Sequence, residues 1–218
     1  MTPERFRRLQ RILARRQHDL TVLMDRVHKP HNLGAVVRTC DAVGIARVHI
    51  VPTEDYYERG RTAMGASRYV RVSRHHSLDA AIGRLHERGI RVVAAHPGPG
   101  AADFRALDYT RPTALLLGTE LEGLSTEAIA AADAHAAVPM YGAVRSLNVS
   151  VAAAIILYEA ERQRARAGFY DRALPDDDAT RRTLFEWAYP RIAALCRRRG
   201  VAYPRLTARG EIAGEVPR

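Results

Sequence analysis

Two patterns alternate along the chain between residues 20 and 167. Short runs rich in Val, Ile and Leu predict buried strands, at residues 20–27, 48–52, 69–73, 91–96, 113–118 and 136–140. Apolar residues that recur every three or four positions predict helices, at residues 32–43, 78–88, 126–132 and 148–167. Strands that alternate with helices predict an α/β fold, with a mostly parallel sheet and helices on both faces.

Both ends of the chain predict helical arms. Phe6, Leu9 and Leu13 recur at helical spacing, and arginines occupy another face of the same segment. This pattern is typical of an arm whose apolar side docks and whose Arg side faces out, although an ordinary solvated helix has the same pattern. The last predicted helix begins almost wholly apolar and becomes Arg-rich, so we expect it to leave the core. The predicted organisation is a basic arm at 1–19, a domain at 20–160 and a basic helical extension at 161–218.

Composition excludes several classes of protein. Of the 218 residues, 47% are apolar and 27% charged, which is typical of a globular chain and argues against general disorder. The longest apolar run, residues 151–158, is too short to cross a membrane, and the N-terminus lacks the apolar segment of a secretory signal. Cys40 and Cys196 have no metal-binding or redox spacing. We therefore expect a cytoplasmic protein without a disulfide scaffold, a metal site or a membrane partner.

Charge is concentrated at the two ends. The net charge is +10, and residues 1–20 carry +4, residues 21–157 carry +2 and residues 158–218 carry +4. Lys29 is the single lysine among 34 basic residues, so a general preference for arginine explains part of the excess. A nearly neutral centre between basic ends favours a catalytic core with arms that hold a polyanion, most simply a nucleic acid.

The first segment with candidate chemistry, residues 28–44, follows a predicted strand and opens a helix. Asn32 stands where it can cap that helix, and Arg38 follows six residues later, on roughly the same side. An arginine among apolar neighbours costs desolvation unless it is paired. Read alone, Asn32 is a plain cap.

Two later segments also hold residues that could either cap a helix or face a ligand. Residues 115–129 hold two glycines around an acidic turn, and glycines allow backbone to approach a ligand closely. Glu122 and Ser125 could equally be a solvated turn and a helix cap. Ser146 and Asn148 precede the apolar helix, where they are good caps or could point into a pocket.

Together and in this order, the segments resemble the SpoU branch of the SPOUT RNA methyltransferases. The motifs are N-L-G-A-V-V-R at 32–38, G-T-E-L-E-G-L-S at 118–125 and V-P-M-Y-G-A-V-R-S-L-N-V-S at 138–150. The arms look like those of members that modify tRNA. The resemblance implies a C-terminal trefoil knot that holds S-adenosyl-L-methionine, and a homodimer with active sites at the subunit interface.

The resemblance also implies roles for individual residues. The positions matching cofactor contacts are Ala95, Gly118, Val138, Met140 and Leu147. The positions matching the family's functional residues are Asn32, Arg38, Glu120, Ser146 and Asn148. Glu120 and Asn32 would position Arg38, which the family proposal makes the general base for a ribose 2′-hydroxyl. Because a guanidinium stays protonated in proteins, Arg38 is equally a candidate to grip a phosphate and stabilise the developing alkoxide. His31 is a further candidate base.

The expected activity is ribose 2′-O-methylation of tRNA, at guanosine 18 in the D-loop. The residues expected to contact RNA are Arg8, Arg11, Arg15, Arg16, His31, Arg162, Arg164 and Arg166. Two alternatives stay open at this point. One is the same chemistry on ribosomal RNA, and the other is an RNA-binding protein without catalysis.

Overall fold

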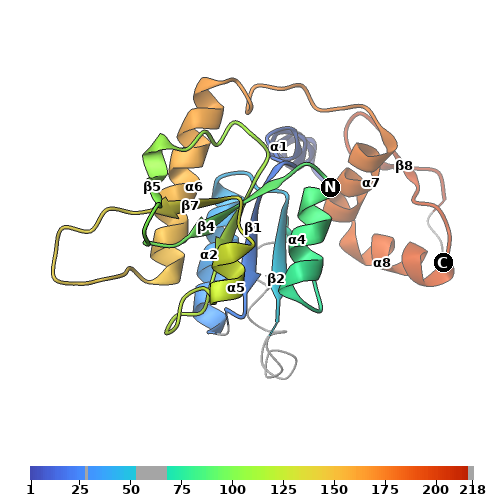
Figure 1. Ribbon diagram of the computed structural model, residues 1–218. Coiled ribbons are helices and arrows are strands. Elements are labelled where there is room, and N and C mark those ends of the chain that lie inside the picture. Colours follow the sequence, from blue (N-terminus) through green and yellow to red (C-terminus); the bar gives the residue numbers. More distant parts are fainter. Residues whose placement is uncertain (28, 53–67, 216–218) are drawn as a thin grey trace. The chain divides into compact units, whose positions relative to one another are not determined.

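The computed structural model describes residues 1–27, 29–52 and 68–215. The chain forms two units (Figure 1). The core unit is Gln17–Phe169, and the terminal unit combines Met1–Arg16 with Tyr170–Arg218. These bounds differ from the expected 20–160 and 161–218, because the long helix α6 (Val149–Arg166) belongs to the core unit along its whole length.

A seven-stranded sheet forms the centre of the core unit. Its order is β3-β2-β1-β6-β4-β7-β5, and every neighbouring pair is parallel. The strands are β1 (Leu20–Asp25), β2 (Arg47–Val51), β3 (Arg71–Arg74), β4 (Arg91–Ala95), β5 (Ala102–Asp103), β6 (Thr113–Leu117) and β7 (Ala134–Ala137). All six predicted strands are confirmed with shifted ends. The sequence pattern missed β5, because two residues carry no periodicity.

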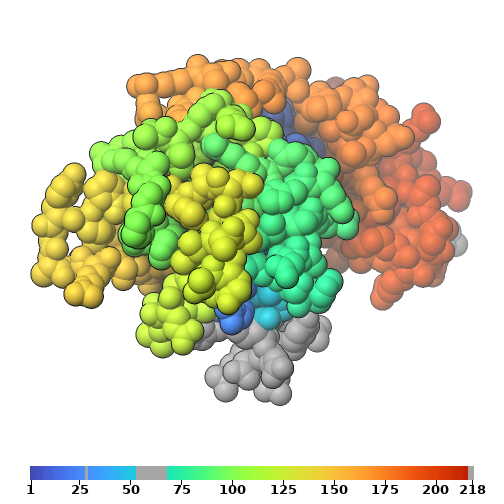
Figure 2. Space-filling model, in the orientation of Figure 1, coloured from blue at the N-terminus to red at the C-terminus, as the bar shows by residue number. Residues whose placement is uncertain are grey.

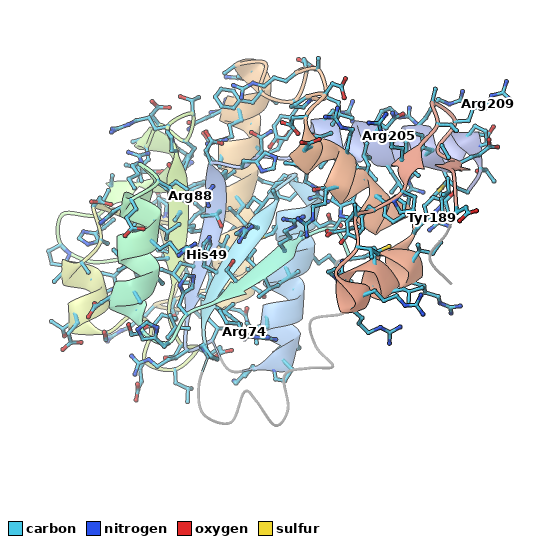
Figure 3. The ribbon with its side chains drawn as sticks, turned by 90° about the vertical axis from the view of Figure 1, so that its right-hand side faces the viewer. His49, Arg74, Arg88, Tyr189, Arg205 and Arg209 are labelled. Carbon is cyan, nitrogen blue, oxygen red and sulfur yellow. The ribbon has the colours of Figure 1, made fainter. Side chains whose placement is uncertain are left out.

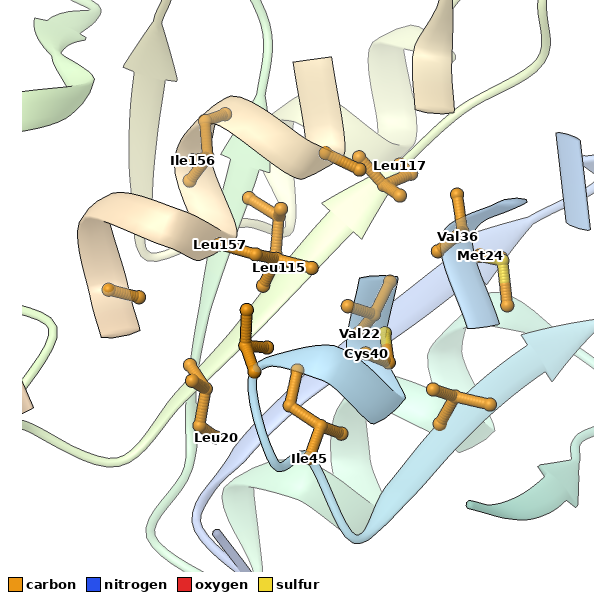
Figure 4. Close-up of a cluster of buried hydrophobic side chains, with 14 of the residues drawn as sticks. Leu20, Val22, Met24, Val36, Cys40, Ile45, Leu115, Leu117, Ile156 and Leu157 are labelled. Atoms are coloured by element: carbon orange, nitrogen blue, oxygen red, sulfur yellow. The ribbon is translucent and has the colours of Figure 1, made fainter. Parts of the chain in front are cut away.

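Helices cover both faces of this sheet, as predicted. Helices α2 (Pro30–Ala42) and α6 pack on one face, where Val36, Leu115 and Leu157 belong to one apolar cluster (Figure 4). Helices α4 (Leu78–His86) and α5 (Thr126–Ala130) contribute to a second cluster on the other face. Central strands buried on both faces explain why the predicted strands are continuous apolar runs. The trefoil knot stays a prediction.

The terminal unit is built from both ends of the chain. Helix α1 (Pro3–Ala14) begins after Thr2, whose side chain accepts a hydrogen bond from the Arg5 N–H, and it packs on α7 (Asp178–Ala188). Helix α8 (Pro190–Arg199) and the hairpin of β8 (Arg205–Leu206) and β9 (Ile212–Ala213) complete the unit. The predicted apolar side of α1 is confirmed, because its buried residues are Phe6, Leu9 and Leu13.

No helix in the described part of the chain is both long and apolar enough to span a membrane.

Candidate active site

A cavity of about 280 Å³ opens where the strands β4, β6 and β7 end. All five positions predicted to contact the cofactor line it, together with the predicted functional residues Glu120 and Ser146. The five are Ala95, Gly118, Val138, Met140 and Leu147. In parallel sheets, ligands bind at the carboxyl ends of the strands, so this cavity lies where the fold favours a ligand.

The loop after β6 is held closed by its own backbone. The Thr119 N–H donates to the Gly123 carbonyl over 2.8 Å, and the Gly123 N–H donates to the Thr119 carbonyl over 3.1 Å. A Cβ at position 118 would overlap the Gly123 backbone, so this close approach requires Gly118. Gly123 has a φ of +72°, a conformation that favours glycine. The two glycines therefore shape one wall of the cavity.

Three of the predicted functional residues form a hydrogen-bonded chain beside the cavity. The Asn32 Nδ2 donates to Glu120 Oε1 over 2.8 Å, and the Asn148 Nδ2 donates to Asn32 Oδ1 over 3.2 Å. Asn32 is 1% exposed, so both ends of its amide are fixed by side chains that lie 88 and 116 residues away in sequence. The sequence motifs meet here as one polar assembly.

The prediction that Asn32 caps a helix is wrong. Helix α2 begins at Pro30 after Lys29, and no side chain caps it. Asn32 lies inside the first turn and points to Glu120 instead. Proline suits this first helical position because it has no N–H to satisfy there.

The expectation that Asn32 and Arg38 share one side of α2 is also wrong. Asn32 is buried and Arg38 is exposed. Six residues rotate a helix by about 600°, which leaves the two side chains about 120° apart, and they are about 9 Å apart along the axis. Asn32 and Glu120 bond each other, and no hydrogen bond joins either of them to Arg38 among the described residues. Arg38 therefore faces solvent rather than an internal partner.

The residues before α6 divide into a cap and a cavity wall. Asn148 caps α6, because its Oδ1 accepts hydrogen bonds from the Ser150 N–H at 2.8 Å and the Ser150 hydroxyl at 2.7 Å. Ser146 lines the cavity and is exposed. Ser125 caps α5 through the Ala128 N–H. The cap interpretation thus holds for Asn148 and Ser125, and Asn148 also belongs to the polar chain.

Two polar groups near this edge escaped the sequence analysis. The backbone N–H of Lys29 donates to Glu120 Oε1 over 3.2 Å, so the start of α2 also fixes Glu120. Asp25 is buried at the carboxyl end of β1, where burial raises the pKa of its carboxyl group and the Arg26 charge opposes that rise. The sequence did hold a signal for Asp25, since it is an acidic residue at the end of an otherwise mostly apolar strand.

The predicted RNA contacts of the N-terminal arm are mostly accessible. Arg8, Arg11 and Arg15 are exposed on α1 and just after it. Arg16 is a correction, because it is 6% exposed and its guanidinium lies 5.7 Å from the centre of the Trp187 ring. Because its guanidinium packs on an aromatic ring, Arg16 has a structural role and not the predicted RNA contact.

Arg164 is the clearest correction among the RNA contacts. It is fully buried, and its guanidinium donates to the Tyr109 carbonyl, the Gln17 side chain and Asp19 over 2.8, 3.0 and 2.6 Å. Its guanidinium also lies 4.9 Å from the centre of the Phe169 ring. This side chain holds the core unit together and does not reach solvent.

The other predicted contacts are exposed. Arg166 and His31 are exposed, and Arg162 is exposed while it binds Glu159 through two hydrogen bonds of 2.7 and 2.6 Å. His28, which flanks the first motif, lies outside the described residues. Within residues 1–27, 29–52 and 68–215, no three His, Cys, Asp or Glu side chains are grouped so as to hold a metal ion.

Two known families match almost the whole chain. The SpoU rRNA Methylase family matches residues 19–158, and the SpoU rRNA methylase C-terminal family matches residues 162–215. These matches, together with the parallel sheet and the cavity at its carboxyl edge, indicate an RNA methyltransferase fold. The chain belongs to the SpoU rRNA Methylase family.

Individual relatives are more specific. The tRNA (guanosine(18)-2′-O)-methyltransferase of Escherichia coli K12 is 46% identical over 220 residues, which cover 99% of this chain and 96% of the relative. The enzyme of the same name from Thermus thermophilus is 49% identical over 187 residues, or 85% and 96% of the two chains. The crystal structure of the Aquifex aeolicus TrmH/SpoU tRNA modifying enzyme matches with a TM-score of 0.78 at 38% identity, over 86% and 96%.

A further solved relative holds a cofactor. The SpoU methyltransferase AviRb from Streptomyces viridochromogenes, crystallised with AdoMet, matches with a TM-score of 0.61 at 31% identity, over 69% of this chain and 62% of that one. The cavity here suits such a molecule. Ala95, Val138 and Met140 give it apolar walls, and Glu120 places a carboxylate among its lining residues.

Proposed function

We propose that this chain transfers a methyl group from S-adenosyl-L-methionine to the ribose 2′-oxygen of guanosine 18 in tRNA. The observation that carries the proposal is the polar chain Glu120–Asn32–Asn148, which adjoins a cavity lined by all five expected cofactor positions. Two relatives named for this activity, at 46% and 49% identity, support the choice of substrate.

The proposal gives each part of the site a task. Gly118 and the apolar residues of the cavity bind the cofactor, which supplies an electrophilic methyl group when it is bound. Glu120 and Asn32 fix the mouth of the cavity, since each is held by hydrogen bonds. Arg38, exposed on α2, binds the substrate phosphate and stabilises the alkoxide that develops on the ribose. The 2′-hydroxyl would lose its proton to water as the oxygen–methyl bond forms and the sulfur–methyl bond of the cofactor breaks, which would leave a neutral thioether. Holding the 2′-oxygen in line with the methyl group is the main requirement of the reaction.

The arms favour tRNA over ribosomal RNA as the substrate. The alignment with the Escherichia coli tRNA enzyme covers 99% of this chain, which includes both ends. The exposed arginines Arg8, Arg11, Arg15 and Arg166 are available for phosphate contacts. We propose that they hold the tRNA, and the cytoplasmic location stays a prediction.

We also propose that the protein acts as a homodimer with its active sites at the interface. Around the cavity, Leu121, Tyr141 and Val144 are 84%, 95% and 62% exposed, and the loop of Tyr141 projects from the sheet (Figures 1 and 2). Large apolar side chains left exposed on loops beside a cavity favour an interaction surface there. Light scattering should give twice the chain mass for the wild type and the chain mass for a Tyr141→Asp/Val144→Asp variant.

The substrate is tested by methyl transfer from labelled S-adenosyl-L-methionine to two unmodified transcripts, a tRNA and a ribosomal RNA fragment. The proposal predicts label in the tRNA, mapped to the D-loop ribose. Label confined to the ribosomal fragment would mean that the substrate is rRNA and that the reaction is the same. Cofactor binding without label in either would favour a binding protein.

A further inference from the structure

Arginines gather on the side of the core unit formed by β2, β3 and α4, away from both chain ends in sequence. We call Arg47, Arg71, Arg84 and Arg88 the arginine patch. Arg71, Arg84 and Arg88 are exposed and Arg47 is half-buried. Figure 3 faces this side and labels His49 and Arg88, which lie between α4 and the strands. The nearly neutral charge of the central sequence conceals this grouping, because it averages over faces.

Neighbouring groups orient the patch. Arg47 Nη1 donates to Ser73 Oγ over 2.8 Å, which joins β2 to the edge strand β3. His49 lies on β2 and His75 directly follows β3, and His49 Nδ1 and His75 Nε2 are hydrogen-bonded at 2.8 Å. These side-chain links keep the cationic groups on one surface of a short edge pair.

The charges within the patch repel one another. Burial lowers the pKa of Arg47, and Arg71, Arg88 and Arg84 lower it further. The pKa of His49 falls to about 4 through burial and the nearby His75, Arg47, Arg88 and Arg84. The charged groups that shift the pKa of Arg47 are all arginines, and Asp19 is the acidic group that acts with Arg88, Arg71 and Arg47 on the pKa of the nearby His18. The histidines are therefore neutral at pH 7, and the guanidinium groups carry the positive charge.

Positive charges grouped in this way attract anions to this surface. Guanidinium groups bind phosphate oxygens through paired N–H donors. The chain belongs to a family named for rRNA methylation. The backbone of a nucleic acid carries regularly spaced phosphates, which are the anions that such a patch would bind. The patch is at the β3 edge of the sheet, separate from the residues that line the cofactor cavity.

We infer that the arginine patch binds the phosphate backbone of the substrate tRNA, as a second contact surface besides the arms. This inference rests on the proposed function for the identity of the RNA. It assigns Arg84 and Arg88 to affinity and not to the chemical step, because they lie on α4 and just after it, outside both the cavity and the motif residues that the proposed function uses.

The test compares two double variants that each remove two positive charges from the core unit. Arg84→Gln/Arg88→Gln removes charge from the patch. Arg105→Gln/Arg111→Gln removes it from exposed positions elsewhere, of which Arg105 adjoins β5 at the opposite edge of the sheet. Filter binding of an unmodified tRNA transcript at several salt concentrations gives the Kd and its salt dependence, and cofactor binding reports the integrity of the fold.

For the patch variant we expect a Kd for tRNA about tenfold weaker and a slope of log Kd against log salt reduced by about 1 to 2. The control variant should stay within about twofold of wild type, and both should bind S-adenosyl-L-methionine normally. Arg84→Lys/Arg88→Lys should recover most of the affinity. Equal weakening in both variants would overturn the inference in favour of a general charge effect, and unchanged binding would overturn it outright. Wild-type protein that binds tRNA through the patch without methylating it would contradict the proposed function alone.

Discussion

The carboxyl edge of the core unit and the terminal unit use polar side chains in opposite ways. At the edge, Asn32 and Glu120 are fixed by hydrogen bonds to groups far away in sequence. In the terminal unit, Arg8 and Arg11 are exposed on α1 and Arg15 is exposed just after it. Methyl transfer needs atoms held in one geometry, whereas binding a polyanion needs only a sum of charges. Substitutions should therefore act steeply at the edge and gradually in the arm.

The largest effect is expected at Arg38. Arg38→Ala should lower kcat by about 10²–10³, because the proposed function makes Arg38 a donor to the developing oxyanion, and such donors contribute on that scale. Single-turnover methylation at saturating tRNA measures it, with cofactor affinity unchanged. A kcat within threefold of wild type would remove Arg38 from the chemistry.

Arg164 should separate the two kinds of arginine within α6. Arg164→Ala should destabilise the fold by about 3 kcal/mol, since it leaves Asp19, Gln17 and two carbonyls without their donor. Arg166→Ala, at an exposed position, is the matched control and should change stability by less than about 0.5 kcal/mol. Chemical denaturation compares them, and equal stabilities would contradict the buried network.

At Gly118 the expected effect is on the cofactor. Gly118→Ala places a methyl group against the Gly123 backbone, so the loop must open. We expect S-adenosyl-L-methionine to bind at least about tenfold more weakly, by calorimetry. Gly142→Ala is a control, because a Cβ there meets no atom. Unchanged affinity in Gly118→Ala would show that the loop does not shape the cavity.

Glu120 tests whether the edge acts through geometry or charge. Glu120→Gln keeps an oxygen that accepts from Asn32 and the Lys29 N–H, whereas Glu120→Ala removes it. A positioning role predicts kcat reduced about tenfold in the alanine variant and only about threefold in the glutamine variant. Equal losses in both would assign the effect to the negative charge.

The smallest effects are expected in the arm. Arg8→Gln, Arg11→Gln and Arg15→Gln should each weaken tRNA binding by about two- to fivefold, and the effects should add, because the positions are exposed. Each should reduce the salt slope by about 1. If a single substitution abolished tRNA binding, the arm would depend on one precisely placed contact, as the carboxyl edge does, and not on a sum of charges.

The strands and helices were predictable because the apolar periodicity reports burial directly. Arg164 was not predicted to be buried, although the signal was present. It continues the buried stripe of Ala153, Ile156 and Ala160, whereas Arg162 and Arg166 fall on other sides of the helix. Helical rotation would likewise have separated Asn32 from Arg38.

The polar chain at the edge could not be read from spacing. Asn32, Glu120 and Asn148 lie on three separate segments, and only the parallel order of the strands brings those segments together. The family resemblance supplied these residues as a set. Their hydrogen bonds to one another are a property of the fold.

The central claim is tested most directly with a tRNA that carries a single 2′-deoxyguanosine at position 18. The unmodified tRNA should accept one methyl group per molecule at that ribose, and the deoxy tRNA should bind with similar affinity and accept none. Methyl transfer to the deoxy tRNA at the wild-type rate would contradict the account, because the methyl group would then be going to another atom.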